Sequence, residues 1–327
     1  MTNDTITAME LPITETKAKP KSQRFARVLW CAWKWFLGAL SCQGPLVALV
    51  GAGWGYRFAQ RSALKTWWKQ RPNGHERETF REFARSHESL QTFERTPNWI
   101  VAQRKQGYNR LVSMVHSLGI NLWLGFRAWF HSLVFLAIPS GMMMFSWYSG
   151  WDNSFNKGYE QFDVGAILGL VGIFVFIFVM FYLPMAQARF AVTQRGRSFY
   201  DFRLIRRVIR RQWFSCLWLV AGYALAGLPL MVAGAFLGVA TAEQNGGDPN
   251  KLANLSPEEA LAFLESYYFY WGFYVFAAFV WLRAWAARIY ARGLLSCLRT
   301  GRVEESSLSA LEREAMQTTG LRTETNA

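Results

Sequence analysis

The chain has 327 residues, of which 52% are hydrophobic and 17% aromatic, including 16 Trp. One soluble core of this length normally contains less apolar material, so the composition argues against an ordinary soluble domain and favours a membrane protein. The net charge of +14 would suggest nucleic acid in a soluble protein. In a membrane protein it more often reports Lys and Arg kept on the cytoplasmic side, so we expect no nucleic-acid partner.

The first apolar stretch, Trp35 to Tyr56, is free of charge and long enough to cross a bilayer as one helix. Gly44 and Pro45 lie within it, and Pro45 lacks the N–H that a continuous helix uses, which predicts a helix break. A single crossing would also place the basic N-terminus opposite the basic segment that follows. We therefore favour an interfacial or re-entrant hairpin over residues 24–56, with a true first span as the alternative.

The segment 57–127 is basic and helical in character, with breaks predicted at 71–74 and 95–98. We expect two or three short helices in its first part, without a core of their own. From Gly107 to Arg127 the chain is expected to approach the membrane obliquely.

Four further charge-free stretches follow along the chain. The first three are long enough to span a bilayer, and the fourth becomes so if Arg283 and Arg288 extend their charged ends toward the interface. The stretches are 128–151, 164–188, 212–242 and 266–282. They predict an all-α, polytopic membrane protein with four transmembrane helices plus the N-terminal hairpin or fifth span.

Charge is distributed unevenly between these stretches. The connections 152–163 and 243–265 each contain one Lys or Arg, whereas 57–127 contains 13 and 189–211 contains eight. Basic segments remain in the cytoplasm, so we predict that the two connections with little Lys or Arg lie outside the cell. The basic segments and the C-terminus should lie in the cytoplasm. This corresponds to a multi-pass membrane protein whose basic face lies in the cytoplasm.

The segment from Ser198 to Phe214 has the most pronounced amphipathic pattern. Apolar residues recur at three- and four-residue spacing, and arginines occupy the other face. Such a helix would lie in the membrane interface and attract anionic lipid headgroups. Ordinary positive-inside topology would require the same arginines for orientation alone, and this alternative stays open. The candidate headgroup-binding residues are Arg203, Arg206, Arg207, Arg210 and Arg211.

Three stretches resemble a known family: "GPLVALVGAGWGYRF", "LGFRAWFHSLVFLAIPSGMM" and "FYLPMAQARFAVTQRGRSFYDFRLIRRVIRRQWF". They look like a group of prokaryotic integral membrane proteins catalogued as domain of unknown function 4013. The resemblance covers roughly residues 30 to 60 and 115 to 295, and the sequence departs from the pattern over 57–110. It implies a polytopic helical fold in the cytoplasmic (inner) membrane of a prokaryote. It carries no activity or catalytic residue.

No stretch specifies a reaction, a cofactor or a metal. His75, Glu78, Glu82 and His87 do not converge, because the Glu residues alternate with Arg as pairs on a helix face. The four Cys form no CxxC, and the sequence lacks nucleotide-binding and hydrolase motifs. We therefore expect no catalytic residues, no metal and no cofactor.

The predicted organisation has five parts. They are a polar tail (1–23), the hairpin or first span (24–56), the basic segment (57–127), a four-helix transmembrane region (128–292) and a cytoplasmic C-terminal tail (293–327). We predict a non-enzymatic scaffold or accessory subunit whose basic face binds anionic lipid or a protein partner. A small transporter or permease subunit is the alternative, because of the broken first segment and a weak repeat between "AQARF" and "WAARIY".

Overall fold

The computed structural model describes residues 21–71, 78–100, 109–156, 162–244, 256–303 and 305–317. Over these ranges the chain forms helices and turns and contains no strand. Four helices are long and apolar enough to cross a membrane. The predicted all-α polytopic architecture with four long apolar helices is therefore confirmed.

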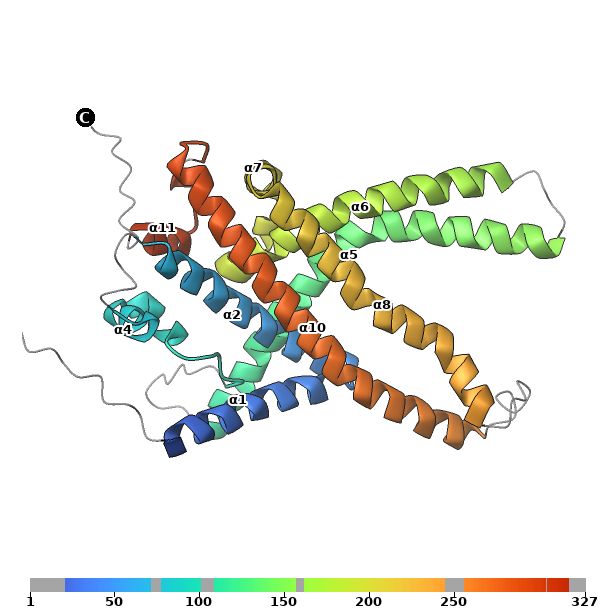
Figure 1. Ribbon diagram of the computed structural model, residues 1–327, viewed down its shortest axis with the longest axis horizontal. Helices are drawn as coiled ribbons and strands as arrows, with labels where there is room; N and C mark the ends of the chain where they lie inside the picture. The colour runs from blue at the N-terminus through green and yellow to red at the C-terminus, as the bar shows by residue number, and fades with distance from the viewer. Residues whose placement is uncertain are drawn as a thin grey trace, which may run out of the picture.

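The N-terminal apolar stretch forms two helices instead of one. Helix α1 (Lys21–Ser41) ends just before a short turn, and α2 (Pro45–Lys69) begins with Pro45 in its first turn after Gly44 as N-cap. A proline is favoured there because the first helical N–H groups have no partner within the helix. The two helices form a bent hairpin whose limbs both lie against α10 (Figure 1).

Protein surrounds the hairpin on its inner side. Trp54 is completely buried, stacks on Trp99 at 5.3 Å between ring centroids, and donates its indole N–H to the carbonyl of Pro97 at 3.0 Å. The side chain of Lys34 on α1 is buried and donates a hydrogen bond to the carbonyl of Thr96 at 3.0 Å. Trp33 on the same helix is half exposed, so the outward face of α1 is apolar.

The four candidate spans are α5 (Arg110–Asn156), α6 (Phe162–Thr193), α8 (Trp213–Gln244) and α10 (Pro257–Arg299). Helix α5 contains 47 residues, which corresponds to roughly 70 Å of helix against about 30 Å of bilayer hydrocarbon. The segment that the sequence predicts as a separate oblique approach is the first part of α5. Arg127 interrupts the apolar run there without interrupting the helix.

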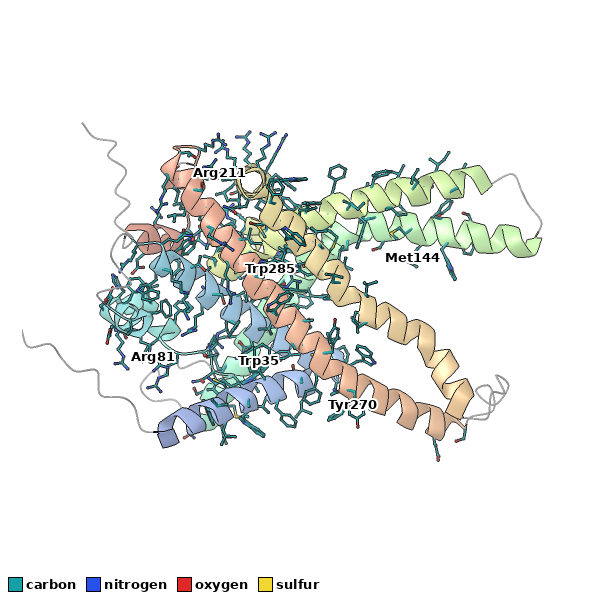
Figure 2. All side chains as sticks on the ribbon, viewed as in Figure 1. Trp35, Arg81, Met144, Arg211, Tyr270 and Trp285 are labelled. Carbon is teal, nitrogen blue, oxygen red and sulfur yellow. The ribbon has the colours of Figure 1, made fainter. Side chains whose placement is uncertain are left out.

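The spans form two antiparallel pairs, α5 with α6 and α8 with α10 (Figure 1). Both pairs extend to the right of the view, where the last residues of α5 and α8 lie. At the left lies the part that we call the basic end: α4, η1, α7, α11 and the C-terminal halves of α2 and α10. Figure 2 shows Arg81 and Arg211 at this end and Met144 far along the α5–α6 arm.

Helix α2 is the central packing element, in contact with α5 on one side and α10 on the other. Its contact with α5 is close enough to exclude any side chain at two glycines. A Cβ on Gly53 would collide with the carbonyl of Asn121, and a Cβ on Gly125 would collide with the carbonyl of Leu49. Small residues at reciprocal positions allow helix backbones to approach in this way.

The basic end contains short elements that share the main core. They are α4 (Phe80–Ser86), η1 (Glu88–Phe93), η3 (Gly196–Tyr200), α7 (Phe202–Arg211), η4 (Glu305–Ser307) and α11 (Ala310–Gln317). The polar segment after Arg57 begins as part of α2, which continues to Lys69. Phe80, Phe83 and Leu90 then pack into the same core as Trp67.

The C-terminal region is more ordered than a polar tail. Gly293, where the sequence predicts the tail to begin, lies inside α10. Val303 and Leu308 are buried, and Glu312 on α11 is completely buried, where it accepts a 2.6 Å hydrogen bond from the Tyr290 hydroxyl. This part of the chain therefore closes the basic end of the core.

Candidate lipid-binding groove at the basic end

The chain turns sharply between α6 and α8, and the arginine-rich helix α7 lies within this turn. Where the sequence predicts one helix from Ser198 to Phe214, the structure has the short η3, then α7, then the start of α8 at Trp213. The Asp201 side chain caps α7 by accepting a hydrogen bond from the backbone N–H of Leu204 at 3.2 Å. An N-cap carboxylate of this kind satisfies one of the free N–H groups at a helix start.

Asp201 also anchors α7 to α6 through an ion pair with the buried Arg189. A second N–H of Arg189 donates to the carbonyl of Ser307 at 3.2 Å. One guanidinium therefore connects α6, the start of α7 and the C-terminal segment. The related motif on α10 has no such role, because Arg288 in "WAARIY" is exposed, whereas Arg189 in "AQARF" is buried.

The apolar face of α7 is turned toward protein and not toward lipid as the sequence predicts. Leu204, Ile205 and Val208 are buried. Val208 lies against α10 at Gly293, where a Cβ would come within 2.7 Å of its side chain. The close approach that Gly293 allows explains why this face finds a partner within the molecule. Phe202, in contrast, is 54% exposed.

The five candidate arginines divide into two groups. Arg207 donates to the carbonyl of Arg302 at 2.5 Å, just after α10, and Arg211 donates to the hydroxyl of Ser296 at 2.7 Å, near the end of α10. Arg203, Arg206 and Arg210 are exposed and have no acidic partner within the described ranges. The structure therefore brings two arginines to α10 and leaves three available.

Two of the available arginines border a groove of about 600 Å³ between α6, α7 and α8, which we call the α7 groove. Arg206 and Arg210 lie at its edge. Two stacked aromatic pairs form its wall. The ring centroids of Phe181 and Trp213 are 4.9 Å apart, and those of Tyr182 and Phe202 are 5.1 Å apart. The principal apolar lining residues are Phe178, Phe181, Tyr182, Phe202, Ile209 and Trp213.

This arrangement is chemically suited to an amphiphile with a negative headgroup. Aromatic and aliphatic walls match an acyl chain, and guanidinium groups bind phosphate through paired N–H donors. Arg203 does not line the α7 groove, although it lies on the same helix. It therefore provides a natural control for the two arginines that do.

The residues considered for a metal lie apart or have other partners. Glu78 pairs with Arg71 at 3.0 Å, and Glu82 completes a capping box with Thr79 at the start of α4. The His87 ring packs on Phe83, whereas His75 falls outside the described residues. Across the described ranges, no three His, Cys, Asp or Glu side chains are grouped as metal ligands would be.

Sequence reasoning missed a buried cation within the last span. Arg283 on α10 is surrounded by aromatic side chains of the protein. Its guanidinium lies over the rings of Phe279 at 5.0 Å, Tyr56 at 5.7 Å and Tyr223 at 5.7 Å. Its Nε and Nη1 are buried without a hydrogen bond. One sequence signal indicates this position: apolar residues lie on both sides of Arg283, from Leu282 to Ala287.

Comparisons with known proteins add no identification. No family model matches the chain, and no curated protein and no solved structure is found to match it. The resemblance to domain of unknown function 4013 therefore stays a prediction, and function must be argued from the geometry alone.

Proposed function

We propose that the protein is a non-enzymatic membrane scaffold or accessory subunit that binds anionic phospholipid in the α7 groove. The observation that carries this proposal is the position of Arg206 and Arg210 at the edge of an apolar groove beside the candidate spans. A lipid bound there would place its acyl chain against Phe178 and Trp213. Its phosphate would then lie within reach of both arginines.

The proposal includes an orientation. The basic end faces the cytoplasm of a prokaryote and lies at the inner membrane surface, with the C-terminus on the same side. The uneven distribution of Lys and Arg supports this orientation, since such residues are kept on the cytoplasmic side. The cytoplasmic leaflet is also where anionic lipid attracts basic segments.

The test compares two double variants of the full chain in nanodiscs that contain phosphatidylglycerol and phosphatidylcholine. R206Q/R210Q removes both arginines of the α7 groove, and R203Q/R299Q removes two exposed arginines at the same end that do not line it. Native mass spectrometry after extraction measures which lipids are retained.

We expect R206Q/R210Q to lose about 30-fold in selectivity for phosphatidylglycerol, from about 1 kcal/mol per basic residue. R203Q/R299Q should retain the wild-type selectivity. Equal losses in the two variants would mean that net charge, and not the α7 groove, selects the lipid, and the proposal would fail.

One observation favours a small transporter or permease subunit as a second candidate. Arg283 is a partly buried cation within a candidate span, with Nε and Nη1 shielded from solvent, and ionisable groups in such positions often lie on substrate pathways. A proteoliposome flux assay with a panel of anionic solutes separates the candidates. Reproducible movement through the wild type that R283M abolishes would replace the scaffold proposal.

A further inference from the structure

A second basic cavity lies between α2 and α10, away from the α7 groove. It measures about 500 Å³, within the usual range for small-molecule sites, and we call it the α2–α10 cleft. Its cations lie on facing helical stripes at intervals of four residues. They are Arg61, Lys65 and Lys69 on α2 and Arg288 and Arg292 on α10. Residues four apart share one face of a helix, so all five side chains line the same cavity.

No carboxylate lines this cleft, because its remaining walls are Phe58, Ser62, Thr66 and Gln70. The charges therefore face one another without compensation from the lining residues. The pKa of the Lys65 ammonium is lowered first by partial burial and then by the charges of Arg61, Lys69 and Arg288.

The cations of the cleft differ in how they are held. Arg61 is fixed by hydrogen bonds to the carbonyls of Phe93 at 2.9 Å and Glu94 at 3.3 Å, and its guanidinium lies 5.2 Å from the Phe80 ring. Lys65, Lys69 and Arg288 are exposed and form no ion pair with the described carboxylates. They remain free to contact a ligand.

We infer that the α2–α10 cleft binds a ligand that carries two or more phosphate groups. Positive-inside topology explains why basic residues occur at this end, but it does not require them to converge from two helices on one cavity. A single phosphate would leave much of the positive charge uncompensated, whereas a polyphosphate could contact both stripes. Arginine binds phosphate oxygens in pairs, and lysine acts as a mobile point charge beside it.

Two sources could supply this chemistry: a soluble polyphosphate or a lipid headgroup with two phosphates. The experiment uses the full chain in the R206Q/R210Q background, which removes the α7 groove arginines and keeps this inference separate from the proposed function. In phosphatidylcholine nanodiscs, calorimetry measures the binding of inorganic tripolyphosphate. In discs that also contain cardiolipin, native mass spectrometry measures how much of that lipid is retained.

The cleft variant is K65Q/R288Q/R292Q, and the control is R95Q/R299Q/R313Q, which removes three exposed arginines outside the cleft. We expect at least tenfold weaker tripolyphosphate binding by the cleft variant and no change in the control, which identifies a soluble ligand. If tripolyphosphate does not bind but the cleft variant alone loses cardiolipin, the ligand is the lipid headgroup. If the cleft variant and the control behave alike toward both ligands, the inference is overturned.

Discussion

Trp67 on α2 donates its indole N–H to the backbone carbonyl of Ala291 on α10 at 2.9 Å, and both residues are buried. This hydrogen bond fixes the two helices at the height of the α2–α10 cleft. Lys65 and Lys69 on one side and Arg288 and Arg292 on the other are one to three residues from the two bonded positions. The spacing of the basic stripes therefore depends on an uncharged contact directly behind them.

We predict that W67F lowers the free energy of unfolding by about 1–3 kcal/mol, because it removes a buried hydrogen bond and leaves unfilled space. Thermal unfolding of the purified protein in nanodiscs measures the effect. W218F is the control, since Trp218 is 67% exposed. If the two variants unfold at the same temperature, the Trp67 contact does not contribute to holding α2 against α10.

The reciprocal glycines on α2 and α5 give a second prediction. G53A should sharply reduce the yield of folded protein, because the new Cβ would strike the Asn121 carbonyl and force the helices apart. G119A, on the partner helix α5, is the matched control, because no neighbouring atom lies within 4 Å of its added Cβ. Size-exclusion profiles and unfolding temperatures measure both.

G119A should be neutral or stabilising by up to about 1 kcal/mol, as alanine is favoured over glycine within a helix. A normal yield of G53A together with a poor yield of G119A would contradict the close packing described for these helices.

The ion pair between Arg189 and Asp201 can be separated from the helix cap. D201N should retain the cap, since asparagine caps as well as aspartate, but it leaves the buried guanidinium without its carboxylate. We expect D201N to lower the free energy of unfolding by about 2 kcal/mol. This lies between the contributions of exposed and fully buried ion pairs, because Asp201 is partly exposed.

Unfolding in mixed micelles compares D201N with D201A and R189M/D201N. D201A should lose about 1 kcal/mol more than D201N through the missing cap, and R189M/D201N should recover part of the loss by removing the unpaired charge. A double variant no more stable than D201N would show that Arg189 contributes mainly through Ser307.

Arg283 is predicted to lower the stability of the fold that contains it. R283M replaces a buried guanidinium with unbonded N–H groups by an apolar side chain, so its unfolding temperature should equal or exceed that of the wild type. Thermal unfolding in nanodiscs measures this. A large decrease would mean that the aromatic contacts with Phe279 and Tyr223 outweigh the cost of burying the charge.

The long apolar helices can be predicted from the sequence. A helix that crosses a bilayer needs about 20 consecutive apolar residues, and such stretches are visible in the sequence. The hairpin is predictable for a similarly local reason, since Pro45 lacks the N–H donor that a continuous helix needs. Helix α1 does end at Ser41 and α2 does begin at Pro45. No local sequence pattern indicates which face of α1 or α2 contacts lipid.

Other features depend on contacts between distant segments and left no pattern along the chain. Helix α5 continues through Arg127, and α10 holds Arg283 against aromatic rings, although a charged residue in an apolar stretch normally indicates the end of a span. The direction of the α7 apolar face depends on Gly293, which only the fold brings beside Val208. The α2–α10 cleft combines two stripes from opposite ends of the sequence, and neither stripe is unusual by itself.

The placement of α2 between α5 and α10 has a consequence for how the protein is made. Helix α2 leaves the ribosome long before α10, which is one of its two main packing partners. Until then, the surface of α2 that contains Trp67 and the three cations of its stripe has no α10 to cover it. The insertion machinery must therefore tolerate a basic, half-packed helix until α10 is made, and any ligand of the cleft could bind only after α10 has been added.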